Sequence, residues 1–287
     1  MKPLLYFVQI LLLTMMTATL SAQERRALAI GIGQYEDPSW GKINADRDLY
    51  YVGEILAEYH FTDVTVLKNE EASKSAIVGQ MESMTARCGL GDIVYIHFSG
   101  HGQQVKDMDG DEEDGYDESW IPYDAYRKCC EADDGSVHLV DDEINVLLTG
   151  IRRKIGEEGQ MLVVVDACHS GGSSRGTRDE DFVTRGVGDI FIPAAVPAGG
   201  ALVDEAWVQI SACEDYQVNF EVRKPKVGKL TYCLYKLRDR LPQMSDDELQ
   251  EELTDMMDSP EMMAPMPQNP RLEDGKERYD VKNVFIR

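Results

Sequence analysis

Short apolar runs alternate with amphipathic stretches along most of the chain. Nearly continuous runs such as "ALAIGIG" and "MLVVVD" predict strands that are covered on both faces. Between them, apolar residues recur every three or four positions, as in "ADRDLYYVGEILAEYH", which is typical of amphipathic helices. The predicted strands lie within 25–35, 62–69, 92–102, 161–172, 205–213 and 281–287, and the predicted helices at 45–60, 73–88, 141–155, 229–240 and 245–257.

This alternation predicts an α/β fold with a mostly parallel sheet and helices on both faces. In such sheets, ligands bind beyond the carboxyl ends of the strands. Three long segments, 103–138, 171–200 and 258–277, fit no regular element. Loops of that length are uncommon in compact domains and are usually functional or disordered.

The first 22 residues have the pattern of a signal peptide. Lys2 supplies the positive start, an apolar stretch follows, and "LSA" before Gln23 is a small-residue cleavage site. A membrane anchor is the alternative, but the apolar run is short for a span and contains Gln9 and Thr14. We therefore expect an exported protein, periplasmic or secreted, with a mature domain over 23–287 and no membrane contact after cleavage.

Composition narrows the class of protein. A chain of 287 residues, 43% of them hydrophobic, suits one α/β domain. The formal charge of −23 repels nucleic acid and anionic membranes and attracts cations and basic peptides. The six cysteines form no CxxC pair or zinc-finger spacing, so a structural metal site is not expected, and no disulfide pair can be assigned.

The candidate catalytic residues lie where two predicted strands end. His101 lies in "SGHG" after one strand and Cys168 in "DACHSG" after another. An imidazole or a helix N-terminus converts a nearby thiol into a nucleophilic thiolate, and glycine turns expose backbone N–H groups, so the amides of Cys168 and Gly102 are candidate oxyanion donors. A cysteine alone is as often a small buried filler, but the second motif favours catalysis. His169 is not the expected base, because adjacent residues tend to point apart.

The two motifs together resemble a known family. "HFSGHG" followed by "VVDACHSGG" is similar to the paired signature of metacaspases and related caspase-like bacterial cysteine peptidases. The similarity continues in chain order through "ALAIGIGQY", "DMDGDEEDGYDESWIPYD", "LVDDEI", "VQISACEDYQ" and "PQNPRLEDG". The resemblance implies a caspase-like fold with a mostly parallel six-stranded sheet. It also implies peptide-bond hydrolysis by a Cys–His dyad, with Cys168 as nucleophile and His101 as general acid/base.

The resemblance implies cleavage after arginine or lysine. Asp166 lies two residues before Cys168, on the same side of the strand, and Asp215 follows the next strand. Such carboxylates suit a guanidinium or ammonium group and repel an acidic one. Ser99 matches a further pocket position of the family. The family's first-helix motif reads "CINDA", whereas this chain has "KINADRD", so Asp46 is either a pocket acid or a helix N-terminal acid.

The resemblance also suggests calcium activation. The segment "DMDGDEEDGYDE" lacks the glycine of an EF-hand loop, and the alternative is a solvated acidic loop. The positions that match family ligands are Asp117, Asp141 and Asp142, whereas a fourth family acid is Arg175 here. Several carboxylates that converge from two segments would repel one another without a cation.

The composition of the loop after Cys168 predicts that the chain cleaves itself there. It is rich in glycine and polar residues, and its candidate sites are Arg175, Arg178 and Arg185. An uncut flexible loop is the alternative. We expect a monomer that acts on proteins or peptides with basic residues. Other functions remain open: a gingipain- or clostripain-like peptidase without calcium activation, or a non-catalytic calcium-binding scaffold. A thiol–disulfide oxidoreductase would need a resolving cysteine near Cys168, and "ACHSGG" contains none.

Overall fold

The fold is described from a computed structural model. It covers residues 23–108, 110, 112, 114–168, 182–194, 206–214, 216–275 and 279–286. The predicted signal peptide and the candidate residues Asp215, Arg175 and Arg178 lie outside the described residues.

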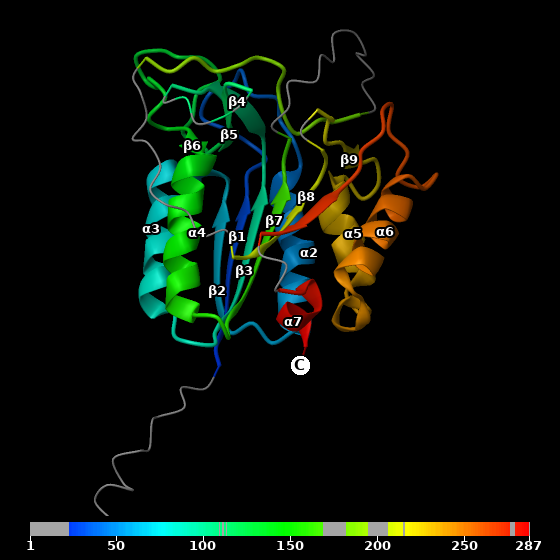
Figure 1. Cartoon of the computed structure of the whole chain (residues 1–287). Coiled ribbons are helices and arrows are strands. Elements are labelled where there is room, and N and C mark those ends of the chain that lie inside the picture. The colour runs from blue at the N-terminus through cyan, green and yellow to red at the C-terminus, as the bar shows by residue number, and fades with distance from the viewer. Residues whose placement is uncertain are drawn as a thin grey trace, which may run out of the picture.

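A six-stranded sheet forms the centre of the fold, as the sequence predicts (Figure 1). The strands are β1 (Arg25–Gly31), β2 (Asp63–Lys68), β3 (Ile93–Ser99), β7 (Gln160–Asp166), β8 (Val208–Ser211) and β11 (Arg271–Asp274). Their order across the sheet is β11-β8-β7-β3-β1-β2. All neighbours pair in parallel except β11, which runs antiparallel to β8 at one edge.

Helices cover both faces of this sheet, because the strands are apolar on both sides. α3 (Lys74–Arg87) and α4 (Asp141–Ile155) lie on one face (Figure 1). α2 (Ala45–Glu58), α5 (Lys229–Leu237), α6 (Asp246–Met257) and α7 (Val281–Phe285) lie on the other. Alternate residues of β1 divide between the two cores: Ala27 and Ala29 face α2, whereas Leu28 and Ile30 face α3. Among the described residues, no helix is both long and apolar enough to span a bilayer.

Two sequence predictions about the sheet were wrong. Residues 281–287 were predicted as the last strand, but Val281–Phe285 form helix α7. Val281, Val284 and Phe285 are buried at helical spacing, and Phe285 packs against Tyr59 with ring centroids 4.8 Å apart. The sixth strand is instead β11, in a segment predicted to be irregular, where pairing with β8 overrides the weak four-residue pattern.

The long segment after His101 is also more regular than predicted. It contains β4 (Gly102–Lys106) and β5 (Tyr116–Trp120), which form a small antiparallel sheet with β6 (Leu139–Val140). The remaining elements are the pair β9 (Glu221–Val222) and β10 (Val227–Gly228) and two short 3-10 helices, η1 (Asn69–Glu71) and η2 (Leu241–Gln243).

Candidate active site

Strand register brings His101 and Cys168 to one edge of the sheet. β3 and β7 are parallel neighbours with Ser99 opposite Asp166. His101 and Cys168 each follow that pair by two residues, so they lie at the same level beyond the carboxyl ends of the strands. Both side chains are buried, with 2% and 1% of their surface exposed. The site therefore lies where ligands bind in parallel α/β sheets.

The hydrogen bonds of His101 define its tautomer. Nε2 lies 2.7 Å from the Gly41 carbonyl oxygen, which can only accept, so Nε2 carries the proton and Nδ1 the lone pair. Nδ1 is buried and has no hydrogen-bond partner among the described residues. Burial lowers the pKa of His101 to about 4, although the Gly41 bond opposes the shift. The imidazole is thus neutral near pH 7 and able to accept a proton.

The backbone amide of Cys168 binds a carbonyl oxygen of the chain itself. It donates to the Arg185 carbonyl at 2.7 Å, while Cys168 Sγ lies 3.0 Å from the Gln217 carbonyl oxygen. Gly102 pairs with Trp120 across β4 and β5. Because the flanking Ile121 N–H donates to the His101 carbonyl at 3.1 Å, the Gly102–Trp120 pair shares no hydrogen bonds, and the Gly102 amide points away from β5. It therefore remains a candidate second donor to an oxyanion.

The Arg185 side chain occupies a pocket lined by three carboxylates. Its guanidinium is 0% exposed and makes two hydrogen bonds with Asp48, at 2.6 and 3.2 Å. It also lies 3.2 Å from Glu221 and 3.4 Å from Asp166. Three acids around one planar cation match the fork geometry of an arginine side chain.

A further layer of polar groups fixes these acids. Ser99 Oγ donates to Asp48 at 2.8 Å. Asp166 accepts from Asn219 Nδ2 and from the backbone N–H and hydroxyl of Thr231. Glu221 accepts from the backbone and side chain of Asn44. The carboxylates are thereby oriented independently of Arg185.

The pocket also requires a glycine. A Cβ at Gly228 would lie 2.1 Å from Asp166 Oδ2 and 2.5 Å from Arg185 Nη1, both far inside van der Waals contact. The Gly228 amide donates to Asp48 at 3.0 Å. Any larger residue would therefore displace the guanidinium or the acids that bind it.

Burial and neighbouring charges shift the pKa values of Asp48 and Asp166 in opposite directions. Burial raises the pKa of Asp48 to about 6, against the opposing charge of Arg185. For Asp166, burial also disfavours the carboxylate, but the Arg185 charge and the bonds from Asn219 and Thr231 outweigh it and lower the pKa. The charges of Asp48 and Asp166 in turn outweigh the burial of Arg185 and raise the pKa of its guanidinium. Asp166 thus remains ionised in the occupied pocket.

Two predictions about the pocket are corrected by these contacts. Asp46 does not reach it, because its carboxylate pairs with Lys68 at 3.3 Å on the outer side of α2. Asp48, two residues further and therefore on the opposite side of the helix, is the pocket acid. Arg185 was expected in an accessible loop, but its side chain is completely buried.

The residues around Arg185 lie as an added antiparallel strand. The Arg185 N–H donates to the Asn219 carbonyl and the Glu221 N–H to the Val183 carbonyl, both at 2.9 Å, while Thr184 bridges Phe220. This is how extended peptides bind to a free strand edge. A Cβ at Gly186 would lie 2.5 Å from the Cys168 carbonyl oxygen. The peptide bond between Arg185 and Gly186 thus lies against the cysteine.

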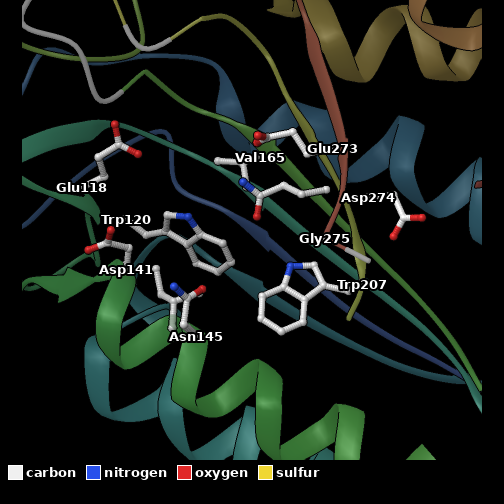
Figure 2. A pocket seen from close by; sticks show the side chains of 11 residues that line it. Glu118, Trp120, Asp141, Asn145, Val165, Trp207, Glu273, Asp274 and Gly275 are labelled. Carbon is white, nitrogen blue, oxygen red and sulfur yellow. The ribbon is translucent and has the colours of Figure 1, made fainter. Parts of the chain in front are cut away.

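The residues that line a separate cavity of about 340 Å³ include four acids (Figure 2). Glu118 and Asp141 lie on one side of it and Glu273 and Asp274 on the other, with Trp120 and Trp207 between them. Burial, together with the charges of Glu118, Glu112 and Asp142, raises the pKa of Asp141 to about 7.

These carboxylates include only part of the predicted calcium set. Asp117 is buried and alternates along β5 with Glu118, so Glu118 rather than Asp117 faces Asp141. Within the described ranges, no group of three or more His, Cys, Asp or Glu side chains is arranged to hold a metal ion. The predicted ligands Asp117, Asp141 and Asp142 therefore do not form a ready-made site.

A thiol and a neutral imidazole that follow neighbouring strands, with an acidic pocket nearby, match the groups that Cys–His hydrolysis uses. The model of the metacaspase peptidase C14 domain matches residues 25–174, and the chain belongs to this family. Over 158 residues this chain is 34% identical to Metacaspase-1B of Aspergillus terreus. The aligned region covers 51% of this chain and 38% of that protein. The chain thus spans little more than a third of that relative's length.

Solved structures agree with the fold. A crystal structure of a Geobacter sulfurreducens protein is 26% identical and has a TM-score of 0.63, covering 87% of this chain and 92% of that one. Caspase-1 from Spodoptera frugiperda, at 11% identity and a TM-score of 0.59, covers 88% of this chain and 89% of that chain. The second similarity concerns the fold alone, which is caspase-like, as the sequence predicts.

Sequence reasoning missed several residues of the pocket. Glu221 and Asn219 lie in a short segment without any pattern, and Gly228 is one glycine among 24. Asp48 could have been found, because it faces the same side of α2 as Val52 and Ile55, which are buried. An acid on the buried side of an amphipathic helix needs a partner and so indicates a site.

Proposed function

We propose that this domain is an endopeptidase that hydrolyses peptide bonds after arginine, and also after lysine. The observation that supports it most is Arg185, whose guanidinium lies among Asp48, Asp166 and Glu221 while its carbonyl accepts from the Cys168 amide. An acidic side chain would be repelled there. A lysine ammonium is a point charge that cannot reproduce the fork between Asp48 and Glu221, so we expect slower cleavage after lysine.

The chemistry follows from the two residues at the strand ends. His101 Nδ1 accepts the thiol proton, and Cys168 Sγ forms a bond to the carbonyl carbon of the substrate arginine. The Cys168 amide, with the Gly102 amide as candidate second donor, stabilises the oxyanion that develops. His101 then gives the proton to the departing amine, the C–N bond breaks, and a thioester remains. Water, deprotonated by His101, hydrolyses the thioester and releases the acid and the free thiol.

Peptide hydrolysis tests this proposal. Fluorogenic peptides that differ only in the last residue, Arg, Lys or Asp, are compared on wild type and on Cys168→Ala. We expect Arg to exceed Lys, no turnover of the Asp peptide, and complete loss in Cys168→Ala. Equal or faster cleavage after Asp would refute the specificity. A Cys168→Ala chain with unchanged turnover would refute the nucleophile, and a wild type without any turnover would favour a scaffold.

We further propose that the chain cuts itself after Arg185. Val183, Thr184 and Arg185 pair with 219–221 as a substrate would, and Gly186 contacts Cys168. Arg175 and Arg178 remain alternative sites. Until the cut occurs, Arg185 competes with other substrates for the pocket.

We also propose that calcium activates the domain, through Asp141 and Asp142 with Asp117. Support comes from the acids that gather at the start of α4, where Asp141 lines a cavity with Glu118, Glu273 and Asp274. A cation would relieve their mutual repulsion. Since the ligands are not already assembled, the ion would have to draw them together. No step of the hydrolysis is assigned to it.

A further inference from the structure

Phe182, three residues before Arg185, has partners of its own. Its ring lies at 79° to the Phe220 ring, with centroids 6.2 Å apart. On the same ring, the Arg223 guanidinium carbon lies 4.1 Å from the centroid. Edge-to-face aromatic contacts and cations within about 6 Å of a ring are both attractive.

The two partners are fixed by the strand that binds the rest of the segment. Phe220 is 3% exposed, and its N–H donates to Gln268 Oε1 at 3.0 Å. It bridges Thr184, so Phe182 lies diagonally across from it on the same face of the paired strands. The guanidinium of Arg223, just after β9, reaches the same ring. An aromatic ring three residues before the arginine therefore contacts two side chains, Phe220 and Arg223.

We propose that Phe220 and Arg223 form a binding subsite for an aromatic side chain three residues before the cleaved arginine. The segment Phe182–Gly186 is then a template for the preferred substrates: an aromatic residue, two variable residues, arginine and glycine. Glycine follows because a Cβ at Gly186 would collide with Cys168. This inference rests on the proposed arginine specificity and adds a second determinant to it.

Four fluorogenic peptides test the subsite: Phe-Val-Thr-Arg, Leu-Val-Thr-Arg, Ala-Val-Thr-Arg and Asp-Val-Thr-Arg. On the wild-type chain we expect kcat/KM for the Phe peptide to exceed that for the Ala peptide about tenfold, with Leu between them. Arg223→Gln should lower the Phe-to-Leu ratio to the part that the Phe220 ring supplies, and Arg223→Lys should retain more of it. Arg238→Gln is the matched control, because Arg238 lies 4.3 Å over the Tyr235 ring on α5, and its ratios should equal those of wild type.

Equal rates for Phe and Ala would overturn the subsite, and so would a preference for Asp, which would make Arg223 an ion-pair partner instead. A chain that cleaves none of the four peptides would count against the proposed function. Binding then still tests the subsite. On a chain with Cys168→Ala, Phe182→Ala and Arg185→Ala, labelled Phe-Val-Thr-Arg should bind about tenfold more tightly than Ala-Val-Thr-Arg by fluorescence anisotropy. Equal affinities there would also overturn it.

Discussion

The backbone N–H of Cys168 donates a hydrogen bond of 2.7 Å to the carbonyl oxygen of Arg185. In the proposed mechanism this amide stabilises the oxyanion, so the Arg185 carbonyl lies where the carbonyl of a substrate would bind. The Arg185 side chain fills the acidic pocket at the same time, so the proposed arginine specificity would have side chain and backbone both bound as in a substrate. Each consequence of this arrangement can be measured.

Asp48 is expected to determine arginine recognition. Asp48→Asn removes the charge that makes two bonds with the guanidinium, and a charge-assisted hydrogen bond contributes about 1.5–3 kcal/mol. kcat/KM for arginine peptides should fall at least tenfold. Asp46→Asn is the matched control, since Asp46 pairs with the half-exposed Lys68 away from the pocket, and it should change the rate less than twofold. A larger loss of kcat/KM in Asp46→Asn than in Asp48→Asn would show that Asp46 binds the arginine instead.

Gly228→Ala should close the pocket to arginine. The added Cβ would lie 2.1 Å from Asp166 Oδ2, so the guanidinium or the carboxylate must move. We expect KM for arginine peptides to rise at least tenfold. Gly53→Ala in α2 is the control, because nothing lies within 4 Å of its Cβ, and that variant should keep its activity and gain about 0.5–1 kcal/mol of stability. Unchanged KM in Gly228→Ala would place substrate arginine elsewhere.

Calcium dependence is predicted to follow Asp141 and Asp142. Activity in millimolar calcium should exceed activity in chelator, and the double change to Asn should abolish the difference without unfolding the chain. Because the pKa of Asp141 is raised to about 7, calcium must compete with a proton, so its apparent affinity should rise as pH increases through 7. α6 begins with the same Asp-Asp-Glu sequence, so Asp246→Asn with Asp247→Asn is the control. Equal rates in calcium and in chelator would exclude activation.

His97 should make stability depend on pH. It bonds to Tyr95, Ser99 and Thr231, and burial lowers its pKa from an ordinary 6.5 to about 4. Between these values the unfolded chain binds the proton and the folded chain does not, so stability falls as pH decreases. From pH 7.5 to pH 5 wild type should lose about 2 kcal/mol more than His97→Gln in urea unfolding.

The exposed turn residue His60 provides the control for that experiment. His60→Asn should retain the wild-type dependence on pH. A loss in His97→Gln as large as in wild type would show that His97 does not contribute to the pH dependence.

The fold was largely predictable because the spacing of buried apolar residues within each segment indicates whether it is a strand or a helix. β1, β3 and β7 are nearly continuous apolar runs, and β2 and β8 alternate between apolar and polar residues. Neither pattern depends on distant partners, and Ser73 caps α3 as expected. β11 was missed because its four residues become a strand only by pairing with β8, more than fifty positions earlier. α7 was mistaken for a strand because five residues are too few to separate the two periodicities.

The site was predictable only where motifs follow strands. His101, Cys168, Asp166 and Ser99 are set by the ends of β3 and β7, which the sequence indicates. Glu221 reaches the pocket from a two-residue strand, and Asp48 through the rotation of α2. Glu221 has no pattern in the nearby sequence, whereas Asp48 follows the helical spacing of Val52 and Ile55 and could have been found from it. Arg185 binds to acids from α2, β7 and β9 at once, so its burial could not be predicted from the composition of its loop.

Mapping the new terminus of the purified chain tests the account most directly. Wild type, Cys168→Ala and Arg185→Gln are incubated in millimolar calcium, and their fragments are identified by intact-mass and N-terminal mass spectrometry. The account predicts a fragment that begins at Gly186 in wild type and is missing from both variants. A first cut after Arg175 or Arg178, the same cut in Cys168→Ala, or an intact wild type that hydrolyses arginine peptides at full rate would contradict it.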